Sequence, residues 1–334
     1  MPTFEGRTAD EAWRQALQFF RNGGVPLVPD TRTGATIEVL HAHFAIADPR
    51  QRWVISRHPP INPAYAIAEV VWIVNGREDA AFPNAWNSQL PKYAGTGEIY
   101  HGAYGFRLRH RFGLDQIQRV YDVLRQSPST RQAVLQVWDP TIDLPDEDGA
   151  AAASDIPCNV CALLKVRQGK LEWLQVLRSN DLMLGVPYNF IQFTTLQEVM
   201  AGWLGIEVGA YHHVSDSLHV YERDLETVCG SCPAALAPNA DSLAVPKDES
   251  DRVFRDLSGA IEHLADPHAT WRDVSTLGLD APLPQPYRNL LLVVGAEAAR
   301  RRKWGDLSAG LIAECTNGGL VQVWERWSER FTRA

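Results

Sequence analysis

The sequence predicts an α+β fold, in which helices are layered on a β-sheet and a helical region follows at the C-terminus. Two observations support this prediction. Segments with strand and helix character do not alternate strictly, as they would in a doubly wound parallel sheet. Residues from about 290 to the end have a largely helical pattern. We therefore expect one domain over residues 1–334, with its core at about 25–225 and a helical extension at about 249–334.

Helices are expected where apolar residues recur with helical spacing and the ends carry capping residues. Thr8 suits the start of the first helix, and Asn62-Pro63 and Gly76 suit the two ends of a second. In chain order, the predicted helices cover residues 8–20, 64–74, 115–126, 189–204 and 249–264. The predicted strands cover residues 31–40, 131–138, 159–166, 170–178 and 207–215. Residues 77–114 are expected to be irregular, and residues 143–154 to form an acidic, mobile loop.

The composition is that of an ordinary globular protein, with 45% hydrophobic and 22% charged residues. A formal net charge of -8 argues against a protein that binds nucleic acid through a basic face. It still allows a small anionic substrate, because a few arginines can hold a phosphate in one pocket. The chain opens with no signal-peptide pattern, and no apolar run approaches the roughly 18 residues that cross a bilayer. We therefore expect a cytoplasmic protein without a membrane partner.

The five cysteines are expected to be thiols. An odd number in a large chain without a secretion signal does not suggest a disulfide framework. Cys158 with Cys161, and Cys229 with Cys232, form two CxxC pairs, which leaves a structural zinc site as an alternative. The two pairs lie much farther apart than the roughly 20 residues of a compact four-cysteine site. We therefore expect no metal.

Glu69 is a carboxylate inside the apolar helix predicted for residues 64–74. Ionising a carboxyl group in apolar surroundings is costly, so its pKa should rise, which would suit it to proton transfer. In the alternative interpretation, Glu69 lies on a solvent-facing stripe of the helix and has an ordinary pKa.

Cys158 follows Asp155-Ile156-Pro157 at the junction between a loop and a predicted strand. A cysteine attacks as its thiolate, which a nearby cation would favour. We therefore consider Cys158 a candidate nucleophile. In the alternative interpretation it is an ordinary buried cysteine.

The third feature is a long segment that begins with Arg178-Ser179-Asn180-Asp181 and continues through Gly185 to Asn189. Arg178 offers a planar fork of hydrogen-bond donors and Ser179 a further donor, a combination suited to phosphate. Asn189 presents a donor and an acceptor side by side, as the edge of a pyrimidine requires. In the alternative interpretation the segment is a plain turn, with Asn189 as a helix cap.

Together these segments resemble the thymidylate synthase superfamily. That family has a Pro-Cys nucleophile before a strand, as Pro157-Cys158 does here, and about twenty residues later an Arg-Ser-x-Asp segment that runs into Gly-Val-Pro-Phe-Asn. The same spacing occurs in residues 178–189. The further matching segments are Arg32-Thr33-Gly34, Glu69-Val70-Val71-Trp72, Tyr104-Gly105 and His219-Val220-Tyr221. The resemblance covers roughly residues 25–224, and it implies a large mixed β-sheet layered with helices.

The resemblance implies a catalytic group of Cys158, Glu69, Tyr104 and Asn189. Cys158 would add to C6 of a pyrimidine, so that C5 attacks the methylene of 5,10-methylenetetrahydrofolate, the expected co-substrate. Glu69 and ordered water would move protons at the ring, and Asn189 would read the base edge.

The resemblance also implies the binding residues for a pyrimidine nucleoside monophosphate and for folate. The phosphate would be held by Arg32, Arg178 and Ser179, and by Arg131 of a second copy, which implies a C2 homodimer. The ribose hydroxyl would be bound by His219 and Tyr221. On the folate side the implied residues are Asp181, which would contact the pterin, Gly185 and Tyr188.

Several positions differ from the family pattern. The usual Pro-Cys-His is Pro157-Cys158-Asn159 here, and the second of two interface arginines is Gln132. The Gly-Gly-Asp before His-x-Tyr is Ser215-Asp216-Ser217. Phe82-Pro83 stand about where the family has the tryptophan that shields the transferred carbon from water. A helical extension replaces the family's short apolar C-terminal tail, which closes over the substrates.

The last two differences bear on the product. Shield and tail keep water away from an exocyclic methylene that must wait for a hydride. Without them water can add, so we expect 5-hydroxymethylation, with the methylating thymidylate synthase reaction as the main alternative. A non-catalytic nucleotide- or folate-binding protein and a zinc-stabilised structural protein remain alternatives of other classes.

The identity of the nucleotide stays partly open. Asn189 favours uracil, although its amide could turn to accept cytosine. Tyr188 stands where the family usually has phenylalanine. Its hydroxyl could read a ribose 2′ position, or the ring could simply pack like phenylalanine.

Overall fold

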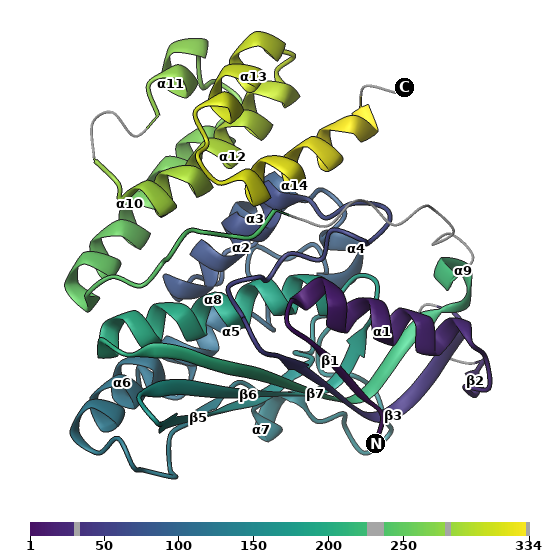
Figure 1. Cartoon of the computed structure of the whole chain (residues 1–334). Helices are drawn as coiled ribbons and strands as arrows, with labels where there is room; N and C mark the ends of the chain where they lie inside the picture. The colour runs from purple at the N-terminus through teal and green to yellow at the C-terminus, as the bar shows by residue number, and fades with distance from the viewer. Residues whose placement is uncertain (30–33, 226–236, 278–281, 332–334) are drawn as a thin grey trace.

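A computed structural model describes the chain at residues 1–29, 34–225, 237–277 and 282–331 (Figure 1). The predicted phosphate ligand Arg32 and the second cysteine pair, Cys229 and Cys232, lie outside these residues. The predicted α+β fold is confirmed: a mixed β-sheet carries helices on one face, and a further helical layer follows towards the C-terminus.

The described part of the chain forms a seven-stranded sheet in the order β1-β3-β7-β6-β5-β4, with β2 paired to β3. The strands are β1 Thr3–Gly6, β2 Leu27–Val28, β3 Thr36–Ile46, β4 Val134–Gln136, β5 Asn159–Arg167, β6 Lys170–Asp181 and β7 Glu207–Tyr221. β6 and β7 run parallel, as do β1 and β3, whereas the other pairs are antiparallel. The β6–β7 register places Ser179 beside Ser217 and Asp181 beside His219. Predicted site residues from distant segments are therefore neighbours.

Four strands differ clearly from their predictions, and one of them, β3, was predicted at residues 31–40 but ends at Ile46. β6 continues past residue 178 to Asp181, and β7 continues past residue 215 to Tyr221. These ends are paired: β7 lies between β6 and β3 over this stretch. β4 has only β5 as a partner and is shorter than predicted, at Val134–Gln136. The pairing partners decide these lengths, and the sequence pattern of one strand does not contain them.

The longer helices that pack close to the sheet begin near the predicted positions. They are α1 Ala9–Arg21, α2 Pro63–Val74, α6 Gln116–Gln126 and α8 Val186–Leu204. Thr8, Asn62 and Asp115 each accept a hydrogen bond from a backbone amide in the first turn of α1, α2 and α6. Helix α8 begins three residues earlier than predicted, with Gly185 as its N-cap. The alternative interpretation of Asn189 as a helix cap is therefore wrong.

The connecting segments contain more structure than expected. Residues 77–114, which were expected to be irregular, contain four short helices as well as turns, and α7 includes Asp143, which was assigned to a mobile loop. The short helices are α3 Ala81–Trp86, α4 Pro91–Ala94, α5 Tyr104–Phe106, the π-helix η1 Arg107–Arg111, α7 Pro140–Asp143 and α9 Glu222–Leu225.

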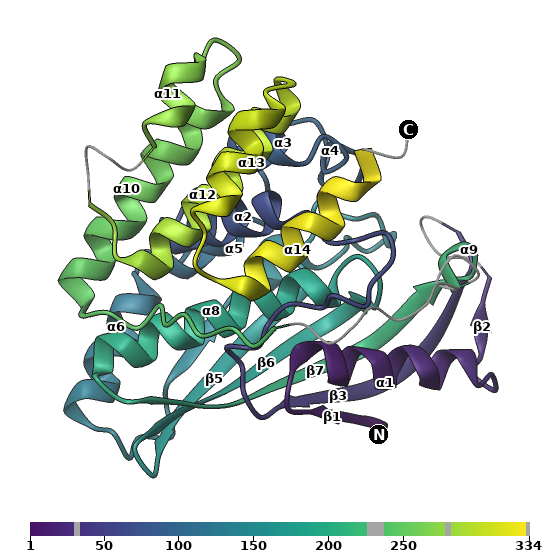
Figure 2. The same cartoon turned by 45° about the horizontal axis from the view of Figure 1, so that its top comes forward.

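Helix α2 is enclosed between two layers. α1 and α8 lie on the sheet, α2 packs on α8, and the C-terminal helices α10, α12 and α14 contact α2 (Figures 1 and 2). The C-terminal layer comprises α10 Lys247–Ala265, α11 Trp271–Ser275, α12 Gln285–Arg301, α13 Gly305–Ala313, α14 Gly318–Ser328 and η2 Glu329–Phe331. This enclosure explains why α2 is apolar on nearly all sides. None of the described helices combines the length and apolar character that spanning a bilayer requires.

Candidate active site

Cys158 lies at the start of β5, directly beside the end of β6. The backbone amide of Arg178 donates to the carbonyl of Cys158 at 2.9 Å, and Asn159 is the register partner of Leu177. The thiol is half-buried. The antiparallel pairing of β5 and β6 thus brings the predicted nucleophile and the Arg178-Ser179 segment together.

The Arg178 guanidinium holds the loop that carries Cys158. Its Nε donates to the carbonyl of Pro157 at 3.0 Å, and a terminal nitrogen donates to the carbonyl of Ile156 at 3.1 Å. The guanidinium also lies 5.3 Å from the centre of the Trp138 ring. Arg178 therefore has a structural role in this loop, in addition to the phosphate contact that the sequence predicts. It also places a fixed cation next to the Cys158 loop.

Tyr104 lies among the candidate reactive groups. Burial raises the pKa of its phenol well above the usual range, the charges of Cys158, Asp155 and Glu69 act in the same direction, and a hydrogen bond with Asn159 opposes them. Its ring packs 6.1 Å from that of Phe193 in α8. The structure therefore brings Tyr104, Cys158 and Glu69 into one region, although they lie on three separate segments of the chain.

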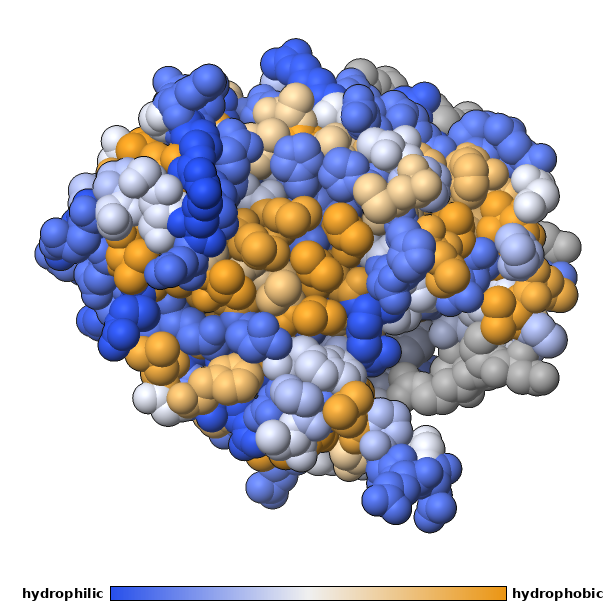
Figure 3. Space-filling view, turned by 90° about the horizontal axis from the view of Figure 1, so that it is seen from below, coloured by the Kyte–Doolittle hydropathy of each residue, from blue (hydrophilic) through white to orange (hydrophobic). Residues whose placement is uncertain are grey.

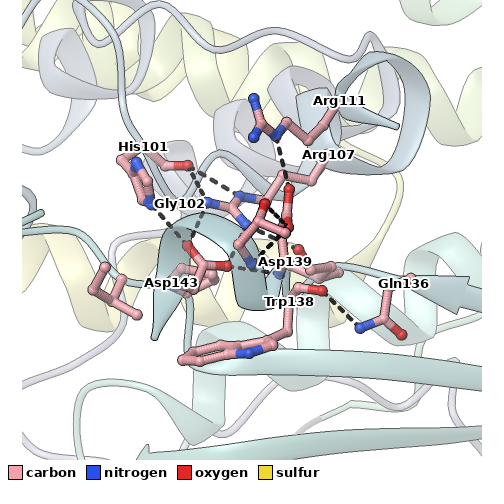
Figure 4. A network of polar contacts seen from close by, with 12 residues as sticks. His101, Gly102, Arg107, Arg111, Gln136, Trp138, Asp139 and Asp143 are labelled. Carbon is pink, nitrogen blue, oxygen red and sulfur yellow. Dashed lines mark hydrogen bonds and ion pairs between the residues drawn. The ribbon is translucent and has the colours of Figure 1, made fainter. Parts of the chain in front are cut away.

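A buried ion-pair network anchors the Tyr104 segment (Figure 4). Arg107 makes two contacts with the Asp143 carboxylate, at 2.6 and 2.9 Å, and also donates to the carbonyl of His101. The His101 ring contacts the same carboxylate at 2.7 Å. The backbone amide of Gly102 donates to Asp155 at 2.9 Å. The network connects the residues around Tyr104 to the loop before Cys158 and to the segment of α7.

Glu69 is half-buried, whereas the other residues of α2 are buried. Its Oε1 accepts a hydrogen bond from the Tyr65 hydroxyl at 2.6 Å, while Oε2 is buried and has no hydrogen-bond partner among the described residues. Burial raises the pKa of Glu69 to about 7, against the opposing effects of Tyr65 and Gln192. The expected rise is thus supported. The alternative of a solvent-facing stripe is not supported, because helices pack on α2 from two sides and Oε2 of Glu69 is buried.

Asn189 lies in the first turns of α8 and faces the end of β6. Its Nδ2 donates to Asn180 Oδ1 at 3.1 Å. Gly185 allows this arrangement, because a Cβ at that position would lie 2.3 Å from Asn180 Oδ1. Gly185 was predicted on the folate side, and the structure gives it this steric role at the base of α8.

Asp181 and its neighbours form the end of the β6–β7 ladder. Asp181 Oδ1 accepts from the backbone amides of Met183 and Leu184 at 2.7 and 2.9 Å. Burial raises the pKa of Asp181, and these amides and His219 oppose the rise. The rings of His219 and Tyr221 meet edge to face at 5.7 Å. The predicted ribose and pterin ligands are therefore adjacent, and Ser179 lies two register pairs away.

Tyr188 packs between α2 and the segment before it. Its hydroxyl oxygen accepts from the Asn62 backbone amide at 3.1 Å, and its ring lies 5.2 Å from that of Tyr65. The guanidinium of Arg57 is 5.9 Å from the same ring. The phenol therefore has a partner within the protein, which favours the packing role over reading of a ribose hydroxyl.

Arg131 is not brought to the site of its own chain. It is exposed in the turn before β4. β4 and β5 are antiparallel with Val134 beside Leu163, so Arg131 lies near the end of β5 that is opposite to Cys158. At about 3.3 Å per residue this separation is roughly 25 Å.

Several residues of the site escaped the sequence analysis. Asn62, Tyr65 and Gln192 surround Glu69 and Tyr188, and Asn180 and His213 continue from Asn189. Tyr65 was detectable, because it lies one helical turn before Glu69. Asn62 was identified only as a helix end and Asn180 only as a member of the Arg178 segment. Gln192 and His213 come from separate elements and carried no sequence signal. Among the described residues, no group of three or more His, Cys, Asp or Glu side chains could hold a metal ion.

The mixed sheet and this arrangement define a class of protein in which a cysteine at a strand start, a buried tyrosine and a carboxyl group on a covering helix lie in one region. A family model described as thymidylate synthase matches residues 22–244. The chain therefore belongs to the thymidylate synthase family, as the resemblance in its motifs predicted.

Three relatives illustrate the range of the family. The chain is 34% identical to a deoxyuridylate hydroxymethyltransferase of Bacillus phage SP01 over 67% of its length and 60% of the relative. It is 31% identical to a protein of the same name from Pseudomonas phage M6, over 68% of this chain and 58% of the relative. It is 24% identical to a thymidylate synthase of Francisella philomiragia, over 64% of this chain and 80% of the relative. The match thus spans about three-fifths of the phage relatives.

Proposed function

We propose that this protein transfers a one-carbon unit from 5,10-methylenetetrahydrofolate to C5 of deoxyuridylate and produces the 5-hydroxymethyl nucleotide. The observation that carries the proposal is that Cys158 and Glu69 both lie within electrostatic reach of Tyr104, with Cys158 beside the Arg178 segment. The names of the two phage relatives support the choice of deoxyuridylate and of hydroxymethyl transfer.

In the proposed reaction the Cys158 sulfur adds to C6, and C5 then forms a bond to the methylene carbon. Loss of the C5 proton and departure of the folate amine leave an exocyclic methylene on C5. Water adds to this carbon, and expulsion of the sulfur from C6 restores the ring. The balance is nucleotide, methylenetetrahydrofolate and water in, and hydroxymethyl nucleotide and tetrahydrofolate out. Glu69, with a pKa of about 7, can both accept and donate protons during these steps.

The methylating reaction is the second candidate, and one observation favours it. Trp86, close in sequence to Phe82-Pro83, is buried next to the start of α2, where its carbonyl accepts from Asn62 at 2.9 Å. Its indole nitrogen is buried without a hydrogen-bond partner among the described residues. A tryptophan at this position, next to the start of α2, could shield the transferred carbon from water.

Product analysis separates the two reactions. The protein is incubated with deoxyuridylate and methylenetetrahydrofolate, and the products are examined by mass spectrometry and for dihydrofolate absorbance. We expect the hydroxymethyl nucleotide and no dihydrofolate, because only methylation oxidises the folate. Thymidylate with dihydrofolate would establish the methylating reaction instead. The Cys158→Ser variant is the control and should release no tritium from C5-labelled deoxyuridylate. If the wild-type protein also released none, it would be a binding protein.

We further propose a C2 homodimer in which each copy supplies Arg131 to the other site. Along β6 and β7 the residues alternate between buried and half-exposed, and the half-exposed side includes Leu174, Val176 and Val214. The face seen in Figure 3 carries a cluster of such apolar side chains. This surface and the exposed Arg131, far from its own Cys158, support the pairing of two copies.

A complementation experiment tests the shared site. Arg131→Ala and Cys158→Ser variants are each expected to be inactive. Mixed after reversible dissociation, they should regain up to about a quarter of the wild-type sites, because only one site of each mixed dimer is intact. No recovery despite mixed dimers in native mass spectrometry would place Arg131 outside the partner's site.

A further inference from the structure

We infer that Asn180 and His213 are positioning residues that fix the orientation of the Asn189 amide and thereby select uracil over cytosine. The inference rests on the proposed function, because it assumes that Asn189 reads a pyrimidine edge. It concerns a buried chain of polar side chains that runs from β7 through the end of β6 to the start of α8.

The chain consists of side chains that are at most 6% exposed. The Tyr211 hydroxyl lies 3.1 Å from His213 Nδ1. His213 Nε2 lies 2.9 Å from Asn180 Nδ2 and 3.1 Å from Ser215 Oγ. At the other end, Asn180 Oδ1 accepts from Asn189 Nδ2 at 3.1 Å. Each member therefore contacts the next, and the last is the predicted base reader.

The orientation of the Asn180 amide, whose Nδ2 lies towards both His213 Nε2 and Ser215 Oγ, gives this chain a direction when His213 is neutral. Burial lowers the pKa of His213 to about 3, so the ring is neutral at physiological pH. A neutral imidazole has one donor and one acceptor. Nε2 accepts from the Asn180 amide nitrogen, and Nδ1 then carries the proton and donates to the Tyr211 hydroxyl oxygen.

This direction fixes both amides in turn. With its nitrogen bound to His213, Asn180 can present only its oxygen to Asn189. Asn189 must then offer its nitrogen to Asn180, which leaves Oδ1 for the substrate. If the Asn189 amide turned over, its oxygen would face the oxygen of Asn180. Two buried acceptors in contact cost about 1–3 kcal/mol or more.

The fixed amide distinguishes the two pyrimidines. Uracil carries a hydrogen on N3, which can donate to Asn189 Oδ1. Cytosine has a lone pair at N3, which would face the same oxygen, and its recognition would require the unfavourable amide orientation. We therefore expect deoxyuridylate to be preferred over deoxycytidylate by about 10–100-fold in affinity.

Paired substitutions at Asn180 test the inference. Asn180→Asp keeps an acceptor for the Asn189 nitrogen, and His213 can respond by moving its proton to Nε2. Asn180→Ala removes the acceptor and releases the Asn189 amide. The measured quantity is the ratio of the dissociation constants for deoxycytidylate and deoxyuridylate, obtained by calorimetry without folate. We expect a preserved ratio in the aspartate variant and a ratio at least 10-fold lower in the alanine variant.

The ratio separates positioning from a general loss of structure, since a damaged site would weaken both nucleotides equally. His213→Leu serves as a second probe and should also lower the ratio, whereas His213→Gln, which retains an acceptor, should preserve it. Equal ratios in wild type and in the alanine and leucine variants would overturn the inference, as would a wild-type preference for deoxycytidylate. A wild-type protein that binds neither nucleotide would instead overturn the proposed function.

Discussion

Two buried glutamates on packed helices, Glu69 in α2 and Glu297 in α12, have opposite electrostatic surroundings. Burial alone would raise the pKa of Glu297, but Arg300 and Arg301 hold it below the usual range. The Glu297 carboxylate contacts Arg300 at 2.8 Å, Arg301 at 2.7 Å and the Trp327 indole nitrogen at 3.1 Å. Glu69 accepts a hydrogen bond from the Tyr65 hydroxyl and forms no ion pair with any residue that the structure describes, and burial raises its pKa to about 7.

The difference separates a structural carboxylate from a reactive one. Arg301 also donates to the carbonyls of Ala85 and Trp86, so Glu297 joins the C-terminal layer to α3. Its charge is fully compensated, and proton exchange there would weaken the fold. Glu69 is left able to change its charge near neutral pH, as proton transfer requires.

The largest expected effect is on catalysis. Glu69→Gln removes the group that exchanges protons near the ring, so kcat for nucleotide turnover should fall about 100- to 10,000-fold. Glu297→Gln serves as the matched substitution in the C-terminal layer, and kcat per folded molecule should stay within a few-fold of wild type. The two rates are measured as product formed per active site. Equal losses in both variants would remove the distinction between the two carboxylates.

The second effect is on the pH dependence of stability. Protonated Glu69 is preferred in the folded state, so the wild type loses stability as pH rises from about 4.5 to about 7, by roughly 3 kcal/mol. Glu69→Gln should not show this loss and should be the more stable protein at pH 8. For Glu297 the sign reverses, because its depressed pKa gives stability that is lost as pH falls through that pKa. Urea unfolding of both variants between pH 4 and 8 measures the two slopes, and parallel slopes would contradict the comparison.

The third effect is on stability at neutral pH. Glu297→Gln leaves Arg300 and Arg301 without their carboxylate, and we expect a loss of about 1–3 kcal/mol in the free energy of unfolding. We propose that the whole chain is one domain, because α12 packs on α2. The loss should therefore appear in a single unfolding transition. Glu314→Gln is the control. Glu314 pairs with Arg288 at 2.6 Å but is 56% exposed, so its loss should be below about 1 kcal/mol. Two separate transitions would show that core and extension are independent.

The smallest effect concerns Tyr65. Its hydroxyl stabilises the ionised form of Glu69, so Tyr65→Phe should raise the pKa of Glu69 further, by up to about one pH unit. Carbon-13 NMR of protein labelled at the glutamate carboxyl carbon measures this value, with Glu69→Gln to assign the signal. Tyr121→Phe, on the separate helix α6, should leave it unchanged. A lower pKa in Tyr65→Phe would mean that another group determines the charge of Glu69.

The sequence predicted the helices with clear caps and the segments that carry the chemistry. The patterns around Thr8 and Asn62 placed α1 and α2 within one residue of their starts, and Cys158 and residues 178–189 were identified from motifs. The full lengths of β6 and β7 were missed, because their ends depend on strands that lie beside them. The buried role of Asp143 was missed because its ion-pair partner, Arg107, lies in a distant segment of the chain. The π-helix that contains Arg107 was missed as well.

By itself the sequence determined which residues are available for chemistry: a thiol, a carboxyl group, an arginine fork and an amide, each in a local pattern of caps, turns and apolar spacing. Local patterns act through near neighbours, so they can be read along one chain. The tertiary structure decided the state of each group. Whether a carboxyl group is neutral or charged, or which way an amide points, depends on cations, donors and burial supplied by distant segments, as at Glu69, Glu297 and Asn189.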